Sequence, residues 1–283
     1  MGFCVTEVIF MNIQHVYAVY FSPTGNTKRL VCQAASEAAR LFQVSCRAIS
    51  LDLPEERERV RTFSAGDLVI VGGPTYAGKL PNKILPTYQE KLIGKGALAL
   101  AVVTYGNRSF DNALAELCAT LDGNGFRTVA AGAFVGTHAF SDALAPNRPD
   151  EDDLALMVRL TDLAVSKIRQ TDGMVPHLVV DGDAQAPYYV PKGVDGQPAK
   201  FLKAKPKTDL EKCVSCGLCA RQCPMGSIDL DQPSVVTGIC IKCQRCVRNC
   251  PKGAKYFDDP AFLSHVKMLE TTYNGRADNK IFI

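Results

Sequence analysis

The chain has 283 residues, of which 47% are hydrophobic and 22% are charged, a balance typical of a soluble globular protein with one or two domains. Its formal net charge of +3 is too small to indicate nucleic-acid binding. No apolar run approaches the ~18 residues that span a bilayer, and the first ten residues lack the features of a signal peptide. The composition therefore predicts no membrane span, and it leaves open whether Met1 or Met11 is the start.

Apolar runs alternate with segments of helical spacing through the first two-thirds of the chain. The runs predict buried strands at 16–21, 67–72, 97–103 and 129–135, and an edge strand at 44–49. Helices are predicted at 27–42, after a cap at Ser109, and at 150–170. Strands that alternate with helices imply a parallel sheet covered on both faces.

Three loops follow predicted strands at their carboxyl ends, which is where open α/β sheets bind ligands. The loop from Ser22 to Thr27 contains hydroxyls and a glycine and precedes a helix, so it is either an anion site or an ordinary turn. The loops at 73–81 and 104–111 carry aromatic residues and glycines. A phosphate site beside aromatic walls would fit a mononucleotide with a large flat ring.

Eight of the twelve cysteines lie in two runs of Cys-x2-Cys-x2-Cys-x3-Cys-Pro, and the second run repeats the first with a shift of 27 residues. Such spacing is typical of iron–sulfur cubes, whereas zinc sites use four ligands and disulfide frameworks occur in small secreted domains. In the two-cluster ferredoxin pattern the fourth cysteine of each run binds the other cluster. This pattern predicts Cys213, Cys216, Cys219 and Cys250 as ligands of one cluster and Cys240, Cys243, Cys246 and Cys223 as ligands of the other.

The remaining cysteines have no pairing spacing and are predicted to be buried free thiols: Cys4, Cys32, Cys46 and Cys118. Because iron–sulfur clusters need a reducing compartment, we expect a cytoplasmic protein. Between residues 200 and 257, eleven Lys or Arg residues face four acidic ones. This excess predicts either a surface that steers an acidic redox partner or general solubility. The sequence does not indicate an oligomeric state.

Residues 171–207 lose helical periodicity and contain five prolines, which predicts an irregular connector. Apolar patches at 178–180 and 188–190 predict that this connector packs on a domain. In the tail, Phe262, Val266 and Leu269 have helical spacing, so a helix is expected to dock on the body of the protein.

Ser22-Pro-Thr-Gly-Asn-Thr27, the Gly-Pro-Thr-Tyr-Ala-Gly loop that ends at Gly78, and Thr104-Tyr-Gly-Asn-Arg108 resemble the phosphate loop and the two isoalloxazine loops of flavodoxins. Together with the cysteine runs, they make the chain resemble the EFR-type flavodoxin–ferredoxin fusion proteins of anaerobic bacteria. The resemblance implies a flavodoxin-like, doubly wound five-stranded parallel sheet of order 2-1-3-4-5, followed by a small α+β two-[4Fe–4S] ferredoxin domain. The implied segments are a flavodoxin-like domain at 12–170, a connector at 171–207, a ferredoxin domain at 208–257 and a tail helix at 258–283.

The resemblance also implies FMN and two [4Fe–4S] clusters as cofactors. It places the FMN phosphate on Ser22, Thr24, Gly25, Asn26 and Thr27. It places the flavin ring on Pro74, Thr75, Tyr76, Ala77, Gly78, Thr104, Tyr105, Gly106, Asn107, Arg108 and Phe110. Because they lie in glycine-flanked loops, Tyr76 and Tyr105 are expected to flank the ring, and the alternative for both, as for Phe110, is a plain core aromatic.

Three further side chains have two interpretations each. Lys79 and Arg108 either place positive charge near the flavin or lie on a solvated rim. His138 is expected to be structural, and the alternative is that it donates a proton at the flavin edge.

These features predict electron transfer between two [4Fe–4S] clusters and FMN, in a low-potential carrier of anaerobic metabolism that exchanges electrons with a redox protein. The main alternative is a ferredoxin-dependent FMN reductase that acts on a quinone or similar acceptor, bound near Tyr76, Phe110, His138 and Phe140. A third is a sensing protein with structural clusters. No catalytic residue is assigned, and the direction of electron flow is left open.

Overall fold

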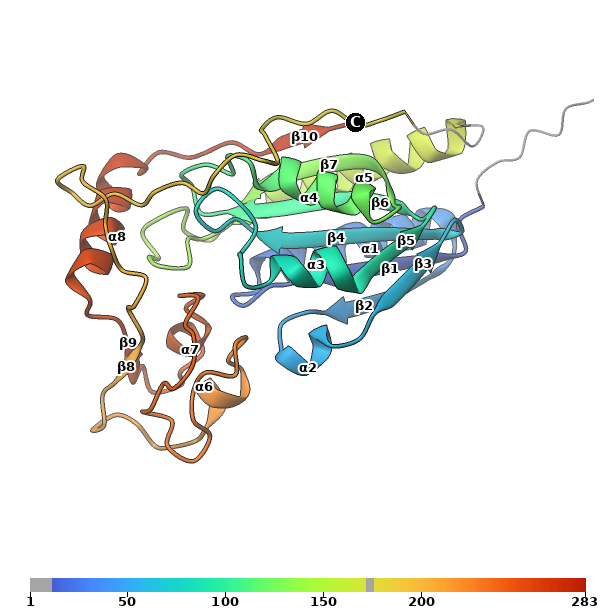
Figure 1. Ribbon diagram of the computed structural model, residues 1–283. Coiled ribbons are helices and arrows are strands. Elements are labelled where there is room, and N and C mark those ends of the chain that lie inside the picture. The colour runs from blue at the N-terminus through green and yellow to red at the C-terminus, as the bar shows by residue number, and fades with distance from the viewer. Residues whose placement is uncertain (1–11, 172–175) are drawn as a thin grey trace, which may run out of the picture.

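The computed structural model describes residues 12–171 and 176–283, and these ranges exclude Cys4 and Met11. The chain forms a central sheet with helices on both faces, and a smaller unit built from the C-terminal third lies beyond one end of that sheet (Figure 1). In the described residues, no helix is both long and apolar enough to cross a membrane.

Five parallel strands make up most of the sheet. They lie in the order β2 (Ser45–Ser50), β1 (His15–Tyr20), β4 (Asp67–Pro74), β6 (Leu98–Tyr105) and β7 (Arg127–Val135). Strand β1 pairs in parallel with both of its neighbours, so that His15 lies opposite Ser45 and Asp67. Counted along the chain, this is the 2-1-3-4-5 order of flavodoxin-like sheets, and it confirms the predicted doubly wound α/β fold.

The sheet has a sixth strand, which corrects the prediction of five strands that are all parallel. Strand β10 (Lys280–Phe282) lies antiparallel beside β7, with Ile281 opposite Gly132. The tail therefore contains the expected helix, α8 (Pro260–Thr272), and then a strand that was not predicted. A separate small parallel sheet, formed by β3 (Arg61–Ser64) and β5 (Leu92–Lys95), was also not predicted.

Two helices cover each face of the sheet, and alternate strand residues point to opposite faces. Val16 and Ala18 share a core with α1 (Asn26–Phe42) and α5 (Glu151–Gln170). Val19 and Val71 share a second core with α3 (Leu85–Lys91) and α4 (Ala113–Gly123). Because both faces are covered, the central strands are apolar throughout, which is the pattern that made them visible in the sequence.

The helix starts show how capping decides a boundary. The carboxylate of Asp150 accepts the amide of Asp153, so α5 begins where the sequence predicts. The predicted cap at Ser109 is wrong, because its hydroxyl accepts the amide of Asp111 in a local turn and α4 begins only at Ala113. One further short helix, α2 (Pro54–Arg57), follows β2.

The C-terminal unit is built from two matching halves. The short helices α6 (Leu218–Arg221) and α7 (Arg245–Arg248) are 27 residues apart and belong to equivalent positions of the repeated cysteine run. Strands β8 (Lys207–Thr208) and β9 (Lys255–Tyr256) pair antiparallel and close the unit.

Of the described cysteines outside the two runs, only Cys118 matches the predicted burial. Cys32 is half-buried, and Cys46 is exposed because it lies on the edge strand β2. The prediction of buried thiols is therefore wrong for Cys46. Every cysteine in the described residues is free of disulfides.

Candidate functional site

The loop after β1 has the geometry of an anion site. Gly25 precedes α1 with φ of 96°, and no atom lies within 4 Å of a Cβ built on it, so the backbone there is open to a ligand. The hydroxyl of Ser22 accepts the amide of Lys28 at 2.9 Å, which fixes the turn. The first amides of a helix have no partner inside it, and α1 therefore presents donors at this point.

Side chains of this loop also bind the ends of neighbouring strands. Thr27 Oγ1 lies 2.6 Å from Thr104 Oγ1, and Asn26 donates to the carbonyl of Thr137 at 3.0 Å. Both side chains are thus used to join three loops at the carboxyl edge of the sheet. With Ser22, three of the predicted phosphate contacts therefore have side-chain partners within the protein.

The next loop contains a buried hydroxyl without a partner. Oγ1 of Thr75 is buried and has no hydrogen-bond partner in the described residues, although its own amide donates to the carbonyl of Thr104 at 2.7 Å. An unsatisfied buried hydroxyl costs free energy, typically about 1–3 kcal/mol, unless a ligand pairs with it. Ala77 and Gly78 follow with φ of 48° and 80°, which turns the backbone sharply beside Tyr76. These features fit a flavin bound between the loops.

Side chains of the third loop point into the protein rather than toward a ligand. Tyr105 is buried, with its hydroxyl donating to the carbonyl of Asp278, and its ring packs 5.7 Å from that of Phe110. Asn107 donates to the carbonyls of Tyr273 and Gly275 at 2.5 and 2.7 Å. Tyr105 is therefore a core residue held by the tail, and the backbone of this loop is what remains for a flavin.

Both basic residues near the predicted ring are paired within the protein. Lys79 is buried, lies 3.0 Å from a carboxylate oxygen of Glu116, and donates to the carbonyls of Ala184 and Ala186 in the connector. Arg108 pairs with Asp111, and its guanidinium lies 4.0 Å from the ring centre of Tyr189. The solvated-rim interpretation is wrong for Lys79, and the neighbouring carboxylates offset both positive charges.

His138 is held as a neutral imidazole. Its Nδ1 lies 3.0 Å from the amide of Phe140 and accepts it, so this nitrogen carries no proton. Burial first, and then the nearby His265, Arg248 and Arg108, together lower the pKa of His138 to about 3. Its ring packs against that of Phe140 at 5.0 Å, and Phe140 packs against Phe262 of α8 at 4.8 Å. These contacts favour the structural role and exclude an imidazolium donor near neutral pH.

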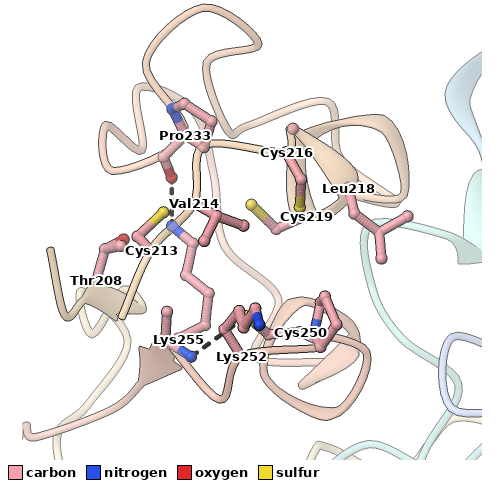
Figure 2. A pocket seen from close by; sticks show the side chains of 13 residues that line it. Thr208, Cys213, Val214, Cys216, Leu218, Cys219, Pro233, Cys250, Lys252 and Lys255 are labelled. Carbon is pink, nitrogen blue, oxygen red and sulfur yellow. Dashed lines mark hydrogen bonds between the residues drawn. The ribbon is translucent and has the colours of Figure 1, made fainter. Parts of the chain in front are cut away.

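The eight cysteines of the two runs line two separate hollows. Cys213, Cys216, Cys219 and Cys250 line the first, which we call the outer hollow. Figure 2 shows the sulfurs of Cys213, Cys216 and Cys219 facing the same space. Cys223, Cys240, Cys243 and Cys246 line the second, which we call the inner hollow. Each hollow thus receives three cysteines from one run and the fourth from the other.

Backbone amides support the sulfurs in the way that metal-bound thiolates require. Ser227 and Ala254, four residues after Cys223 and Cys250, donate their amides to those sulfurs at 3.4 and 3.2 Å. Burial raises the pKa of Cys250, but several amides, that of Ala254 first, outweigh it and lower the pKa below its usual value. Such donors stabilise a charged sulfur, so the outer hollow fits a bound cluster.

The inner hollow has a drier environment. Burial raises the pKa of Cys246 to about 12, so it is a thiol unless a metal displaces its proton. Around a single metal ion, the described residues place no group of three or more His, Cys, Asp or Glu. In a [4Fe–4S] cube each cysteine binds a different iron, and the four sulfurs stand further apart than around one ion. The four cysteines around the inner hollow match the number of ligands that such a cube needs.

The walls of the inner hollow contact the sheet domain, which is why we call it inner. Met225 and Ile241 pack on the same core as α3 and α4, and the carbonyl of Pro224 accepts a hydrogen bond from Arg57. Burial raises the pKa of Tyr76 well above its usual value, and Cys243 and Cys240 are close enough to raise it further. Tyr76, which belongs to the predicted flavin site, is therefore close to the inner hollow.

The outer hollow faces solvent. Cys216 is exposed, and Val214 in its wall is 59% exposed. Figure 2 shows the side chain of Lys255 running along this wall, where its ammonium donates to the carbonyl of Pro233. Lys255 is only 3% exposed, so it places a buried cation beside the outer hollow, a feature that the sequence analysis missed.

In comparisons with known proteins, the family models that match this chain cover its cysteine-rich part. Residues 206–229 and 237–253 each match a family model described as a 4Fe-4S binding domain. No curated protein matches the chain.

Several solved structures are similar to the N-terminal part. A flavodoxin from the domain Archaea is 16% identical, with 56% of this chain and 100% of that one covered and a TM-score of 0.37. An apo NADH:FMN oxidoreductase is 19% identical, with 58% and 95% covered and a TM-score of 0.41. Flavodoxin 2 from Bacillus cereus, in its oxidised form, is 15% identical, with 54% and 97% covered and a TM-score of 0.36. Because these TM-scores are low, the fold is assigned from the strand order of the sheet. The family matches support an iron–sulfur site in the C-terminal third.

Proposed function

We propose that the chain is an electron-transfer protein that moves electrons between two [4Fe–4S] clusters and FMN. The observation that carries the proposal is the division of eight cysteines between two hollows, one of which adjoins the loops at the carboxyl edge of a flavodoxin-like sheet. The placement of the cysteines and the strand order support it independently of each other.

The chain's own residues would hold each group in a defined way. The loop from Ser22 to Thr27 would bind the FMN phosphate through amides and the hydroxyl of Thr24, and the free hydroxyl of Thr75 would bind the flavin. The eight cysteines would bind the irons as thiolates. When bound, FMN would accept two electrons, delivered one at a time by the clusters, together with a proton from water.

The partner is proposed to be a redox protein that approaches the outer hollow. The basic excess of this region is a weaker guide to that partner than the sequence suggests, because several of the charges have partners within the chain. Lys207 pairs with Asp258 and Lys212 pairs with Asp209. We therefore base the docking side on exposure of the outer hollow, and an acidic partner is a secondary expectation.

A small-molecule reductase has less support. Two of the four residues expected around a substrate, His138 and Phe140, pack against each other, and Phe140 also packs against α8. They are thus part of the body of the protein rather than of an open pocket. No described contact favours this second function.

The experiment that tests the proposal is anaerobic purification with iron, sulfide and flavin counts, followed by stepwise reduction. We expect about eight irons, about eight sulfides and one FMN per chain, since each cube holds four of each. Clusters and flavin should then be reduced in separate steps followed by absorbance and EPR. A chain that binds neither iron nor flavin after reconstitution would rule the proposal out.

A further inference from the structure

The two halves of the C-terminal unit share their cysteine spacing but differ in the residues beside the cysteines. Residues 27 apart occupy equivalent positions, so Leu218 corresponds to Arg245 and Arg221 corresponds to Arg248. In the first half, Leu218 lines the outer hollow. Arg221 is exposed and donates to the carbonyl of Cys216, inside its own half.

In the second half, Arg245 reaches the sheet domain instead. Its Nη1 lies 2.9 Å from one carboxylate oxygen of Asp52, and the other oxygen accepts the amide of Ser22 at 2.6 Å. One buried carboxylate thus joins the loop between Cys243 and Cys246 to the first residue of the predicted phosphate loop. In the described part of the chain, Arg245 Nε is buried without a hydrogen-bond partner, so a ligand acceptor beside this loop would satisfy it.

Arg248 binds a different part of the same domain. Its Nε donates to the carbonyl of Ala139 at 3.0 Å, Nη2 donates to that of His138 at 2.7 Å, and Nη1 donates to Asp142 at 2.6 Å. These acceptors follow β7, whereas Asp52 follows β2. In the sheet, β7 and β2 bound the other parallel strands, and the three predicted flavin loops follow the strands between them. The two arginines therefore hold the second half on both sides of those loops.

We infer that Arg245 and Arg248 are positioning residues that hold the inner hollow against the flavin loops. The inference rests on the proposed function and adds an order to it. The inner hollow would hold the cluster that exchanges single electrons with FMN, and the outer hollow would hold the cluster that exchanges them with the protein partner. Each transfer would oxidise one centre and reduce the next by one electron, so that two transfers and one proton from water would reduce FMN.

The order can be tested in the full-length holoprotein by the accessibility of its clusters. We expect an iron chelator under anaerobic conditions to remove iron in two phases, because the sheet domain covers only the inner hollow. Alkylation with iodoacetamide after the fast phase, followed by peptide mass spectrometry, should modify Cys213, Cys216, Cys219 and Cys250. The cysteines of the inner hollow should become reactive only in the slow phase.

Arginine variants then test the positioning role. Arg248→Ala should raise the rate of iron loss in the slow phase about tenfold. This corresponds to a loss of ~1.4 kcal/mol in the free energy that holds the inner hollow against the sheet domain. Arg221→Ala, at the equivalent position of the other half, is the matched control and should change that rate less than about twofold. If Arg248→Ala fails to assemble clusters, Arg248→Lys should assemble them and give an intermediate rate.

The inference would be overturned by alkylation of both cysteine sets in the same phase, or by equal effects of Arg221→Ala and Arg248→Ala. A failure of the proposed function has a different signature. In that case the wild type would show the two protection phases, yet its flavin would be absent or would not be reduced when the clusters are.

Discussion

The two halves of the C-terminal unit start from one repeated cysteine run and end in opposite surroundings. The outer hollow has an exposed cysteine, Cys216, whereas Cys243 at the equivalent position of the inner hollow is buried. In the outer half, Arg221 donates to the carbonyl of Cys216 within the same half, whereas in the inner half Arg248 donates to the carbonyl of His138 in the sheet domain. The difference teaches that a duplicated ligand set acquires separate roles through the residues between the ligands, while the ligands themselves stay unchanged.

The largest expected effect comes from removing one ligand on each side. Cys243→Ala and Cys216→Ala should each lose one cluster, and thus about half of the iron. Only Cys243→Ala should also lose FMN on gel filtration, because the loop it belongs to carries Arg245. Iron and flavin counts on both purified variants check this expectation. Equal flavin loss in the two variants would contradict the distinction between inner and outer hollows.

A second test concerns the residues that follow the last cysteine of each run. Lys255 lines the outer hollow, and Ile228, 27 residues earlier, lines the inner one. A buried cation stabilises the reduced cluster, which carries one more negative charge. Lys255→Ile should therefore lower the outer-cluster potential by ~60 mV or more, which corresponds to a tenfold change for one electron.

An EPR-monitored redox titration measures this shift, and Lys255→Arg, which keeps the charge, is the control. An unchanged potential in Lys255→Ile would show that the ammonium is too well screened by its carbonyl partner, Pro233, to influence the cluster.

The third test exchanges Arg245 for the residue of the other half. Arg245→Leu leaves the buried carboxylate of Asp52 unpaired beside the phosphate loop, where it should repel the FMN phosphate. We expect the Kd of FMN to rise about tenfold, or ~1.4 kcal/mol. Flavin fluorescence quenching gives this Kd.

Asp52→Asn in the Arg245→Leu background provides the check on mechanism. Removing the unpaired charge should restore most of the affinity, and a double-mutant cycle then isolates the pair. Riboflavin, which lacks the phosphate, should bind all these variants with nearly equal affinity. A loss of riboflavin binding as large as that of FMN would refute the electrostatic explanation.

The smallest effect is a pH dependence at the surface that accepts Arg248. The folded pKa of His138 is lowered to about 3 by burial, whereas an unfolded histidine titrates near 6.5. Below pH ~6.5 the unfolded state binds a proton on this histidine, and the folded state does not. The free energy of unfolding is therefore unaffected by His138 above pH ~6.5 and falls as the pH is lowered from there toward 3. Between pH 7 and 5.5 the wild type should lose up to ~1.3 kcal/mol more stability than His138→Asn. Urea unfolding at both pH values measures the difference, and parallel losses in the two proteins would mean that His138 is not the group responsible.

The sequence predicts those parts of the site that local spacing determines. Cysteine spacing defines two ligand sets, hydrophobic runs define four buried strands, and an alternating run defines the edge strand at 44–49. The apolar face of the tail likewise shows a helix at Phe262 and Leu269, both of which are buried. Each of these patterns lies within a few tens of residues of sequence. They can therefore be recognised without knowing which distant segments come into contact in the fold.

What the sequence does not predict depends on segments that meet only in the fold. Strand β10 has three residues, too few for a pattern, and it exists because the tail returns to β7. Tyr105 was expected beside the flavin ring, but the same tail binds its hydroxyl and turns it into a core residue. The roles of Arg245 and Arg248 likewise depend on Asp52 and His138, which lie more than 100 residues away in the chain.

The return of the tail to the sheet has a consequence for the kinetics of electron transfer. The C-terminal unit is an insertion between the connector and β10, both of which lie on the sheet domain, so it has no free end around which to swing. Internal transfer then requires no docking search, and its rate should not depend on solvent viscosity. A slow, viscosity-sensitive step is expected only where the outer hollow meets a separate protein.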